Sequence, residues 1–283
     1  MRSRRQPDRR GHGEVCPQRS DRCRHRDQAD ARDDVCVLTA MAAPEVQYLS
    51  SGDTALTVQF GTVIERELNS RIVALGHSIA KAAIPGVSET LPTYRSLLVN
   101  YDPLVLSRDQ LVAQLQPLVD SPPDADVTAP ARWQVPVCFD SNLAPDLAHV
   151  VAASGMSEAQ VIKAMLDVTH HVYMLGFAPG QPYMGDLPPA LNIPRRENPV
   201  PRVEKGSVAT AAGLTIIYAV PNPTGWYVVG RTPVEIFDLA REQPILFKPG
   251  DKVNLRRIAR DEFDALSAQV DEGSFDMAEL RQP

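Results

Sequence analysis

Alternating apolar and polar positions open the folded part of the chain. The runs "VQYLS" from Val46 and "ALTVQFG" from Ala55 flank a Ser51-Gly52-Asp53 turn, which predicts a β-hairpin. The apolar spacing then changes to every third or fourth residue, which predicts a helix of about 18 residues ending before Pro85. Its apolar positions are Ile64, Leu68, Ile72, Leu75 and Ile79.

A second pair of strands and a second helix follow. The runs "GVSETL" and "RSLLVNYDP" read as strands, and Ser107 with Gln110 has the spacing of a capping box at a helix start. Leu111, Leu115 and Leu118 form the apolar stripe of that helix. The order strand, strand, helix, strand, strand, helix predicts an α+β domain over residues 46–120, with helices on one face of a small antiparallel sheet.

Residues 121–130 are rich in proline and aspartate, so we expect a linker there. Residues 131–260 then hold two short helical segments, the second with a Ser157–Gln160 capping box. Short strand-like runs separated by glycine and proline surround them: "RWQVPVCFD", "HHVYMLGF", "SVATAAG", "LTIIYAV", "GWYVVGRTP" and "ILFKPGDKVNLRRI". This regular spacing of short strands predicts a mostly β domain, either a barrel or a sandwich. Residues 261–283 are expected to be a polar C-terminal tail with one surface helix.

The stretch from Gly176 to Val208 differs from its surroundings. It holds seven prolines and four glycines, so we expect neither a helix nor a central strand there. It is also too apolar for a solvated linker. Two interpretations stay open: an ordered loop with a functional role, or a structural Ω-type loop that caps the end of a barrel.

Composition narrows the function classes. The net charge of −6 argues against a general nucleic-acid binder, and no apolar run is long enough to require a membrane. Residues 1–45 are expected to form a disordered, arginine-rich tail, because the first 40 residues carry ten arginines and seven acidic residues with few apolar ones.

The cysteines do not indicate a metal site. Cys16, Cys23 and Cys36 lie in the tail with spacings that match no structural zinc pattern. Cys138 stands alone in an apolar run, where a cysteine is usually a small buried hydrophobe, and it indicates a reducing, cytoplasmic setting. Phosphate-binding P-loop, nucleophile-elbow, zinc-protease and Rossmann motifs are all missing from the sequence.

Several motifs carry a family resemblance. The segments "SSGDTALTVQFG", "RSLLVNYDP", "GFAPGQPYMGDLPPALNIPRR", "NPTGWYVVGRTPVEIFD" and "LFKPGDKV" occur in order between Val46 and Ile258. Together they resemble the family of the B-type 5-oxoprolinase component, also known as allophanate hydrolase subunit 1. The resemblance implies an α+β N-terminal domain followed by a cyclophilin-like β-barrel. It also implies a partner, a larger C-type subunit. With a third, A-type subunit, such pairs open 5-oxoproline to glutamate and consume ATP.

The same resemblance suggests site residues. The chain departs from the family pattern where it has Met165 in place of a His and Gln181 in place of a Phe. His170 and Lys205 are the catalytic candidates that could take over the missing roles. The expected substrate-binding residues are Phe177, Pro179, Gly180, Arg195, Arg196, Gly206, Ser207, Thr215 and Arg231. Arg195 and Arg196 suit an anionic substrate because a guanidinium binds a carboxylate through two hydrogen bonds.

Three functions stay open at this point. The main interpretation is a component of an ATP-dependent 5-oxoprolinase, inactive without its partner, with a small lactam or amide substrate and ATP as co-substrate. The second is a carboxyltransferase subunit of a urea carboxylase or allophanate hydrolase system. The third is a non-catalytic regulatory binder, such as an inhibitor of a histidine kinase.

Overall fold

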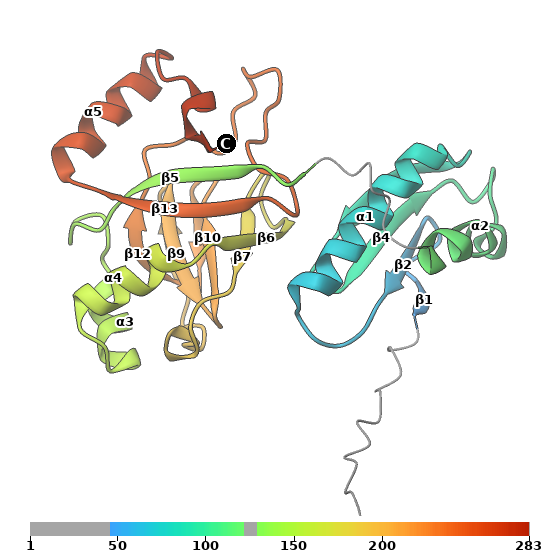
Figure 1. Ribbon diagram of the computed structural model, residues 1–283, viewed down its shortest axis with the longest axis horizontal. Coiled ribbons are helices and arrows are strands. Elements are labelled where there is room, and N and C mark those ends of the chain that lie inside the picture. Colours follow the sequence, from blue (N-terminus) through green and yellow to red (C-terminus); the bar gives the residue numbers. More distant parts are fainter. Residues whose placement is uncertain (1–45, 122–128, 283) are drawn as a thin grey trace, which may run out of the picture. The chain divides into compact units, whose positions relative to one another are not determined.

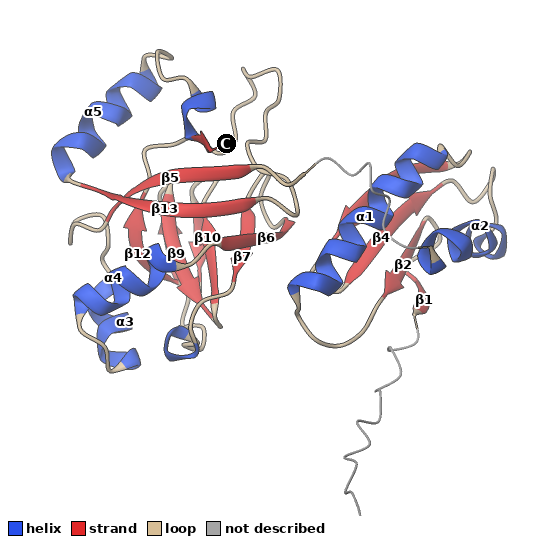
Figure 2. Cartoon of the chain, viewed as in Figure 1, coloured by secondary structure: helices blue, strands red, loops and turns tan. Residues whose placement is uncertain are grey.

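The structure is a computed structural model that describes residues 46–121 and 129–282 (Figures 1 and 2). The expected tail at residues 1–45, with its three cysteines, lies outside the described residues, as do residues 122–128 of the expected linker. The described residues form one sheet of four strands, one of eight and one of two.

The N-terminal domain has the order of elements that the sequence predicts. Its sheet runs β1-β2-β4-β3, and every neighbouring pair of strands is antiparallel. The elements are β1 (Gln47–Ser50), β2 (Ala55–Gln59), α1 (Arg66–Ala82), β3 (Val87–Pro92), β4 (Ser96–Tyr101) and α2 (Arg108–Asp120).

One hydrophobic cluster joins this sheet to its two helices. Leu56 and Val99 of the sheet are fully buried against Ile72 of α1 and Leu115 of α2. The capping box at the start of α2 is present, because Gln110 N donates to Ser107 Oγ at 3.3 Å and Ser107 N donates to Gln110 Oε1 at 2.9 Å.

Two details of this domain differ from the predicted stripes. Ile64 precedes α1 and is 49% exposed, because the helix begins only at Arg66. In α2 the buried position of the last turn is Val119, whereas Leu118 is only partly buried.

The second domain is a β-barrel, so the predicted fold class is confirmed. Among the described residues, eight strands follow the order β12-β9-β10-β7-β6-β13-β5-β14, and an additional pairing of β12 with β5 closes seven of them into a ring. The strands are β5 (Arg132–Cys138), β6 (His170–Leu175), β7 (Pro182–Gly185), β9 (Ser207–Ala211), β10 (Leu214–Ile217), β12 (Tyr227–Arg231), β13 (Lys252–Ile258) and β14 (Arg281–Gln282).

Short elements complete this domain. The two-stranded sheet pairs β8 with β11. These elements are α3 (Leu147–Ser154), α4 (Glu158–Asp167), η1 (Pro189–Leu191), β8 (Val200–Val203), β11 (Asn222–Thr224), α5 (Arg260–Asp271) and η2 (Met277–Leu280). The Ser157–Gln160 capping box opens α4 as predicted.

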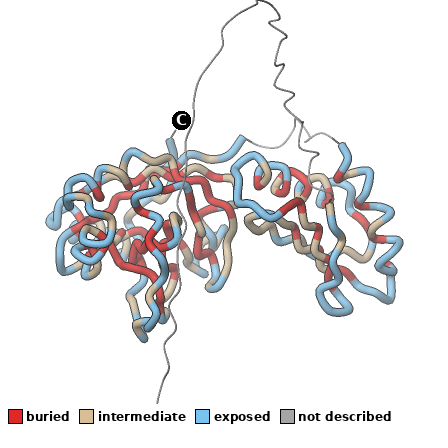
Figure 3. The backbone as a smooth tube through the Cα atoms, turned by 90° about the horizontal axis from the view of Figure 1, so that it is seen from below, coloured by how far each residue is buried: buried red, intermediate tan, exposed pale blue. Residues whose placement is uncertain are grey.

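Strands β5 and β13 run side by side and parallel over seven residue pairs (Figure 1). Helices α3 and α4 pack into the main hydrophobic cluster of the barrel through Val150 and Val161, which are fully buried. Figure 3 shows buried stretches running through the interior of the tube and exposed stretches along its outer turns.

The proline-rich stretch contains a central strand, which corrects one prediction. Strand β7 lies between β6 and β10 in the sheet. It is only four residues long, and Pro182 is its first residue, a position where a strand tolerates proline because fewer ladder hydrogen bonds are lost. The proline content of the whole segment therefore gave a wrong prediction for β7, because the one proline in this strand occupies its first position.

Residues 261–283 were expected to be a polar tail with one surface helix; helix α5 is present, but the described residues also fold onto the barrel. Phe263 of α5 is buried with Cys138 and Ile258. Leu280 joins the main cluster, and β14 pairs antiparallel with β5. Within residues 46–121 and 129–282, helices fall short of the length and apolar character that spanning a membrane requires.

Candidate functional site

A continuous series of ring contacts, which we call the aromatic row, links the two domains. His171 meets Tyr173 with ring centroids 4.7 Å apart, and Tyr173 meets Tyr94 at 5.7 Å. Tyr94 then meets Tyr183 at 6.3 Å, and Tyr183 meets Trp226 at 5.9 Å. Tyr94 and Tyr183 are half-buried, so the middle of the row reaches the surface.

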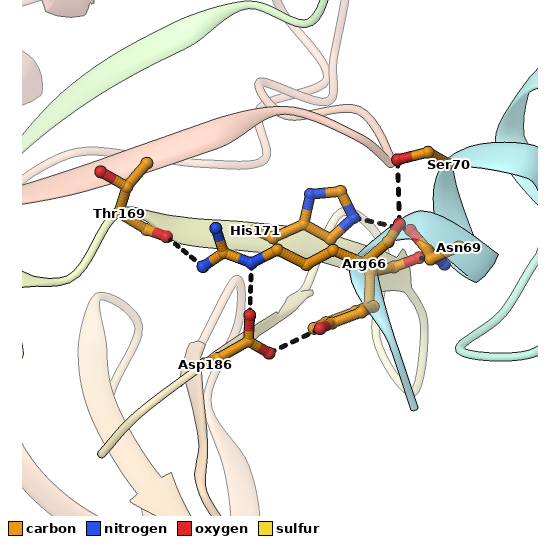
Figure 4. Close-up of polar contacts among 7 residues, drawn as sticks. Arg66, Asn69, Ser70, Thr169, His171 and Asp186 are labelled. Atoms are coloured by element: carbon orange, nitrogen blue, oxygen red, sulfur yellow. Dashed lines mark hydrogen bonds and ion pairs between the residues drawn. The ribbon is translucent and has the colours of Figure 1, made fainter. Parts of the chain in front are cut away.

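Asn69 of helix α1 anchors the first end of the row (Figure 4). Its Nδ2 donates to Thr93 O at 2.8 Å and to Tyr173 O at 3.0 Å, and its Oδ1 lies 2.8 Å from His171 Nε2. Asn69 is fully buried. Packing of α1 alone would not require an amide side chain at this position. The three hydrogen bonds explain why Asn69 is there.

These contacts define the state of His171. The Asn69 amide nitrogen already donates to two carbonyls, so Oδ1 is the acceptor and His171 Nε2 carries the proton. Burial, followed by the Arg66 guanidinium, lowers the pKa of His171 to about 4. The imidazole is therefore neutral near pH 7, with an unprotonated Nδ1.

Asp186 and Arg66 add charge at the same end (Figure 4). Arg66 Nε forms an ion pair with Asp186, and Arg66 Nη2 donates to Thr169 O at 2.8 Å. The Tyr173 hydroxyl donates to Asp186 Oδ1 at 2.5 Å. Burial and this hydrogen bond raise the pKa of Tyr173, so the phenol stays protonated. Asp186 is 47% exposed and can accept a further hydrogen bond from a ligand.

Arg195 lies at the other end of the row. Its side chain is exposed, and it forms no ion pair or hydrogen bond with any residue the structure describes. The guanidinium rests against Gly225, where an added Cβ would lie 3.4 Å from Arg195 Nη2. Glycine before Trp226 thus lets the cation lie close to the backbone beside the aromatic row.

Arg196 has a different role from its neighbour. It forms an ion pair with Asp146, its guanidinium lies 4.5 Å from the Tyr227 ring centroid, and its side chain is 22% exposed. Asp146 also accepts a hydrogen bond from Val228 N at 2.8 Å. Arg196 therefore holds the proline-rich segment against the start of α3 and against β12, whereas Arg195 leaves its guanidinium exposed.

The catalytic candidate His170 faces the interior. It is fully buried, its Nε2 donates to Met165 O at 3.1 Å, and its Nδ1 lacks a partner among the described residues. Burial lowers its pKa to about 4. A substrate cannot reach this ring in the present structure, whereas its neighbour His171 belongs to the aromatic row.

Lys205, Gly206 and Arg231 lie together around a pocket of about 180 Å³. Lys205 forms an ion pair with Glu235, and Arg231 Nε donates to Lys205 O at 3.1 Å. Gly206 has a φ of +77°, and a Cβ there would lie 2.3 Å from Thr232 O, so the turn requires glycine. The structure brings these three predicted residues together. The Lys205 ammonium group is already neutralised by its ion pair with Glu235.

The remaining predicted residues fall into two groups. Phe177, Pro179 and Gly180 form the turn between β6 and β7, where Phe177 is 70% exposed with a φ of +65°. Ser207 and Thr215 are buried barrel residues that a ligand cannot reach in this structure. The predicted set is thus dispersed over the barrel.

Sequence reasoning missed most of the aromatic row and its polar anchors. Asn69, Tyr94, His171 and Asp186 carry no motif of their own, and Asn69 lies 102 positions from His171. One signal was available, because Asn69 is a polar residue next to the apolar stripe of α1. Within the described ranges, no group of three His, Cys, Asp or Glu residues is arranged to hold a metal ion.

Comparison with known proteins gives a family match over most of the chain. The model of the family described as "Carboxyltransferase domain, subdomain C and D" matches residues 46–247. A curated relative, the B-type component of 5-oxoprolinase from Bacillus subtilis (strain 168), is 30% identical over 225 residues, which cover 76% of this chain and 93% of the relative.

Solved structures agree on the fold. The crystal structure of TTHA0988 superposes with a TM-score of 0.65 at 34% identity and covers 72% of this chain, but this chain spans only 40% of that one. The urea amidolyase of K. lactis superposes with a TM-score of 0.68 over 83% of this chain and 16% of its own, at 19% identity. The second match shows a shared fold only.

Proposed function

The chain belongs to the family of carboxyltransferase domains, subdomain C and D, and from this we propose that it is the B-type component of a hetero-oligomeric, ATP-dependent 5-oxoprolinase. The reaction is the opening of 5-oxoproline to glutamate with ATP and water. The observation that carries the proposal is the match to 93% of the length of the B-type 5-oxoprolinase component from Bacillus subtilis.

The geometry supports a subunit that needs a partner. The exposed polar groups at the ends of the aromatic row, Asp186 and Arg195, can bind a ligand, but neither is paired with an activated nucleophile. Lys205 stays a catalytic candidate despite its ion pair with Glu235. A larger C-type subunit, with a third A-type subunit, would complete the site.

The chain itself offers no evident place for ATP among its described residues. The larger pocket, of about 660 Å³, is lined by Arg257 and Arg260 but also by the carboxylates of Asp140 and Glu158. Carboxylates oppose a polyphosphate at close range. We therefore assign no residue of this chain to ATP and derive no step through it.

Carboxyl transfer to urea is the weaker alternative. The K. lactis urea amidolyase is 19% identical, a level at which similarity establishes the fold and not the substrate. No side-chain arrangement described above favours that reaction, and none favours a kinase inhibitor.

Reconstitution tests the proposal. The full chain is co-purified with its native partner, and 5-oxoproline cleavage is measured with and without ATP, with urea as a control substrate. We expect glutamate release that requires both ATP and partner. Absence of cleavage at saturating partner would contradict the function, and cleavage by the chain alone would contradict the need for a partner.

A further inference from the structure

Gln181 is a buried polar residue without a visible role in the fold. Its side chain is fully buried, and neither its amide oxygen nor its amide nitrogen has a well-formed hydrogen bond to a described residue. The Tyr183 hydroxyl is the polar group that lies near this amide. An unpaired buried amide costs about 1–3 kcal/mol, so such a group needs an explanation. Its backbone is held in the turn, because Gln181 N donates to Ala178 O at 3.2 Å and Gly176 N donates to Gln181 O at 3.1 Å.

The side chain lies next to the exposed middle of the aromatic row. Gln181 directly precedes β7, which begins at Pro182, and it lies two positions before Tyr183. Tyr183 is half-buried between Tyr94 and Trp226. Burial raises the pKa of Tyr183, and the Gln181 amide and the Arg195 guanidinium oppose that rise, which agrees with both lying near its hydroxyl.

Arg195 supplies a cation on the same surface. Its guanidinium rests on Gly225, directly before Trp226, and Trp226 contacts Tyr183. Because no described residue takes up its hydrogen bonds, its donors are available to an anion from outside. A guanidinium, a phenol and an unpaired amide therefore converge beside the rings of Tyr94 and Trp226.

We propose that Arg195, Tyr183 and Gln181 form a recognition site for a small molecule that carries both a carboxylate and an amide. The guanidinium binds the carboxylate through two hydrogen bonds. The Gln181 side chain, which has both a donor and an acceptor, pairs with the amide, and the Tyr183 hydroxyl joins it. Because Gln181 is fully buried, ligand binding requires the side chains that cover it to move.

The proposal deepens the function above and rests on it for the choice of ligand. 5-Oxoproline has a carboxylate next to a ring amide. In the proposed site, Arg195 would bind the carboxylate and Gln181 would bind the amide. Burial of an amide that stays unpaired without ligand gives specificity, because an analogue that lacks the matching group leaves the amide unpaired.

Three probes and two variants test the site. Titration calorimetry on the full chain and on its complex with the partner uses 5-oxoproline, 2-pyrrolidinone, which lacks the carboxylate, and proline, which lacks the ring carbonyl. Arg195→Ala should weaken 5-oxoproline binding at least tenfold and leave 2-pyrrolidinone unchanged. Gln181→Leu should weaken both lactams about tenfold and leave proline unchanged. Arg202→Ala, in the same segment but paired with Glu204, is the matched control.

Each outcome decides one question. If Gln181 only holds a buried water, Gln181→Leu changes the melting temperature but not ligand binding, and the site is overturned. Lack of binding of all three probes to the wild-type complex overturns it as well. If the complex cleaves 5-oxoproline while both variants keep the wild-type KM, the site fails and the function stands. If the complex binds 5-oxoproline through Arg195 without cleaving it, the function fails and the site stands.

Discussion

Asn69 of helix α1 accepts a hydrogen bond from His171 of strand β6, with Oδ1 and Nε2 2.8 Å apart. One amide thereby ties the N-terminal domain to the barrel and sets which imidazole nitrogen carries the proton. Through Tyr173, the same contact reaches Asp186 and Arg66.

Removal of this amide should destabilise the protein. Asn69→Leu keeps the approximate volume but leaves His171 Nε2 and the carbonyls of Thr93 and Tyr173 without their partner, so we expect a loss of about 3 kcal/mol in the free energy of unfolding. Urea denaturation measures it. Ser70→Ala is the control, because the Ser70 hydroxyl is exposed and bonds only to its own helix, and should change stability by less than about 0.5 kcal/mol. Equal effects would contradict the anchoring role.

Acid should weaken the fold through two histidines. The pKa of His170 and of His171 is lowered from 6.5 to about 4, so between these values the unfolded chain binds more protons than the folded one. The free energy of unfolding therefore falls as the pH drops from 6.5 toward 4, by up to about 1.4 kcal/mol per pH unit for each histidine. Denaturation at several pH values measures the slope.

A double variant isolates the contribution of these rings. His170→Gln with His171→Gln should flatten the slope, whereas His77→Gln, at an exposed position of α1, should leave it unchanged. An unaltered slope in the double variant would show that other groups control the acid sensitivity.

The two adjacent arginines should behave differently. Arg196→Ala leaves Asp146 half-buried without its ion pair and uncovers the Tyr227 ring, so we expect a loss of about 2 kcal/mol. Arg195→Ala should change stability by less than about 0.5 kcal/mol. Thermal denaturation of the two single variants measures both values. Similar losses in the two variants would mean that both arginines are structural.

Trp226 should be a major packing residue. It is 7% exposed and packs with Ile216, Tyr218 and Val228. Trp226→Ala should cost about 3 kcal/mol or more, because it leaves a large cavity. Trp226→Phe, which refills most of that volume, should cost clearly less. A loss below about 1 kcal/mol for the alanine variant would show that the indole is not part of the core.

Lys205 allows a direct test of a catalytic role. Its side chain is half exposed, and an exposed ion pair contributes about 0–1 kcal/mol, so Lys205→Met should leave stability almost unchanged. In the reconstituted complex a catalytic lysine would make kcat fall a hundredfold or more. Glu235→Gln is the matched control, because it removes the ion pair but keeps the Lys205 side chain. Unchanged kcat in Lys205→Met removes Lys205 from the mechanism.

Local features of this fold are predictable from the sequence, and long-range pairings are not. The capping boxes at Ser107 and Ser157 depend on residues three positions apart, so pattern alone finds them. Strand β7 escapes prediction because its pairing with β6 and β10 outweighs the composition of the segment around it.

The candidate site shows the same limit more strongly. Arg195 was found because two adjacent arginines in a stiff segment attract attention, but nothing local distinguishes it from Arg196, whose partner Asp146 lies 50 positions earlier. From the sequence, Gln181 is recognisable only as a residue that differs from the Phe of the family pattern. Its unpaired, buried amide becomes visible only when the barrel has closed around it.

The parallel pairing of β5 with β13 also constrains how the chain reaches this structure. Lys252 pairs with Arg132, which was synthesised 120 residues earlier, whereas the most distant strand pairing of the N-terminal domain joins Ala55 to Asn100. During synthesis on the ribosome, the first domain can therefore be complete before β13, the parallel partner of β5, has been made. We therefore expect the exposed edge of β5 to be the aggregation-prone surface of the nascent chain and the barrel to set the slow step of refolding.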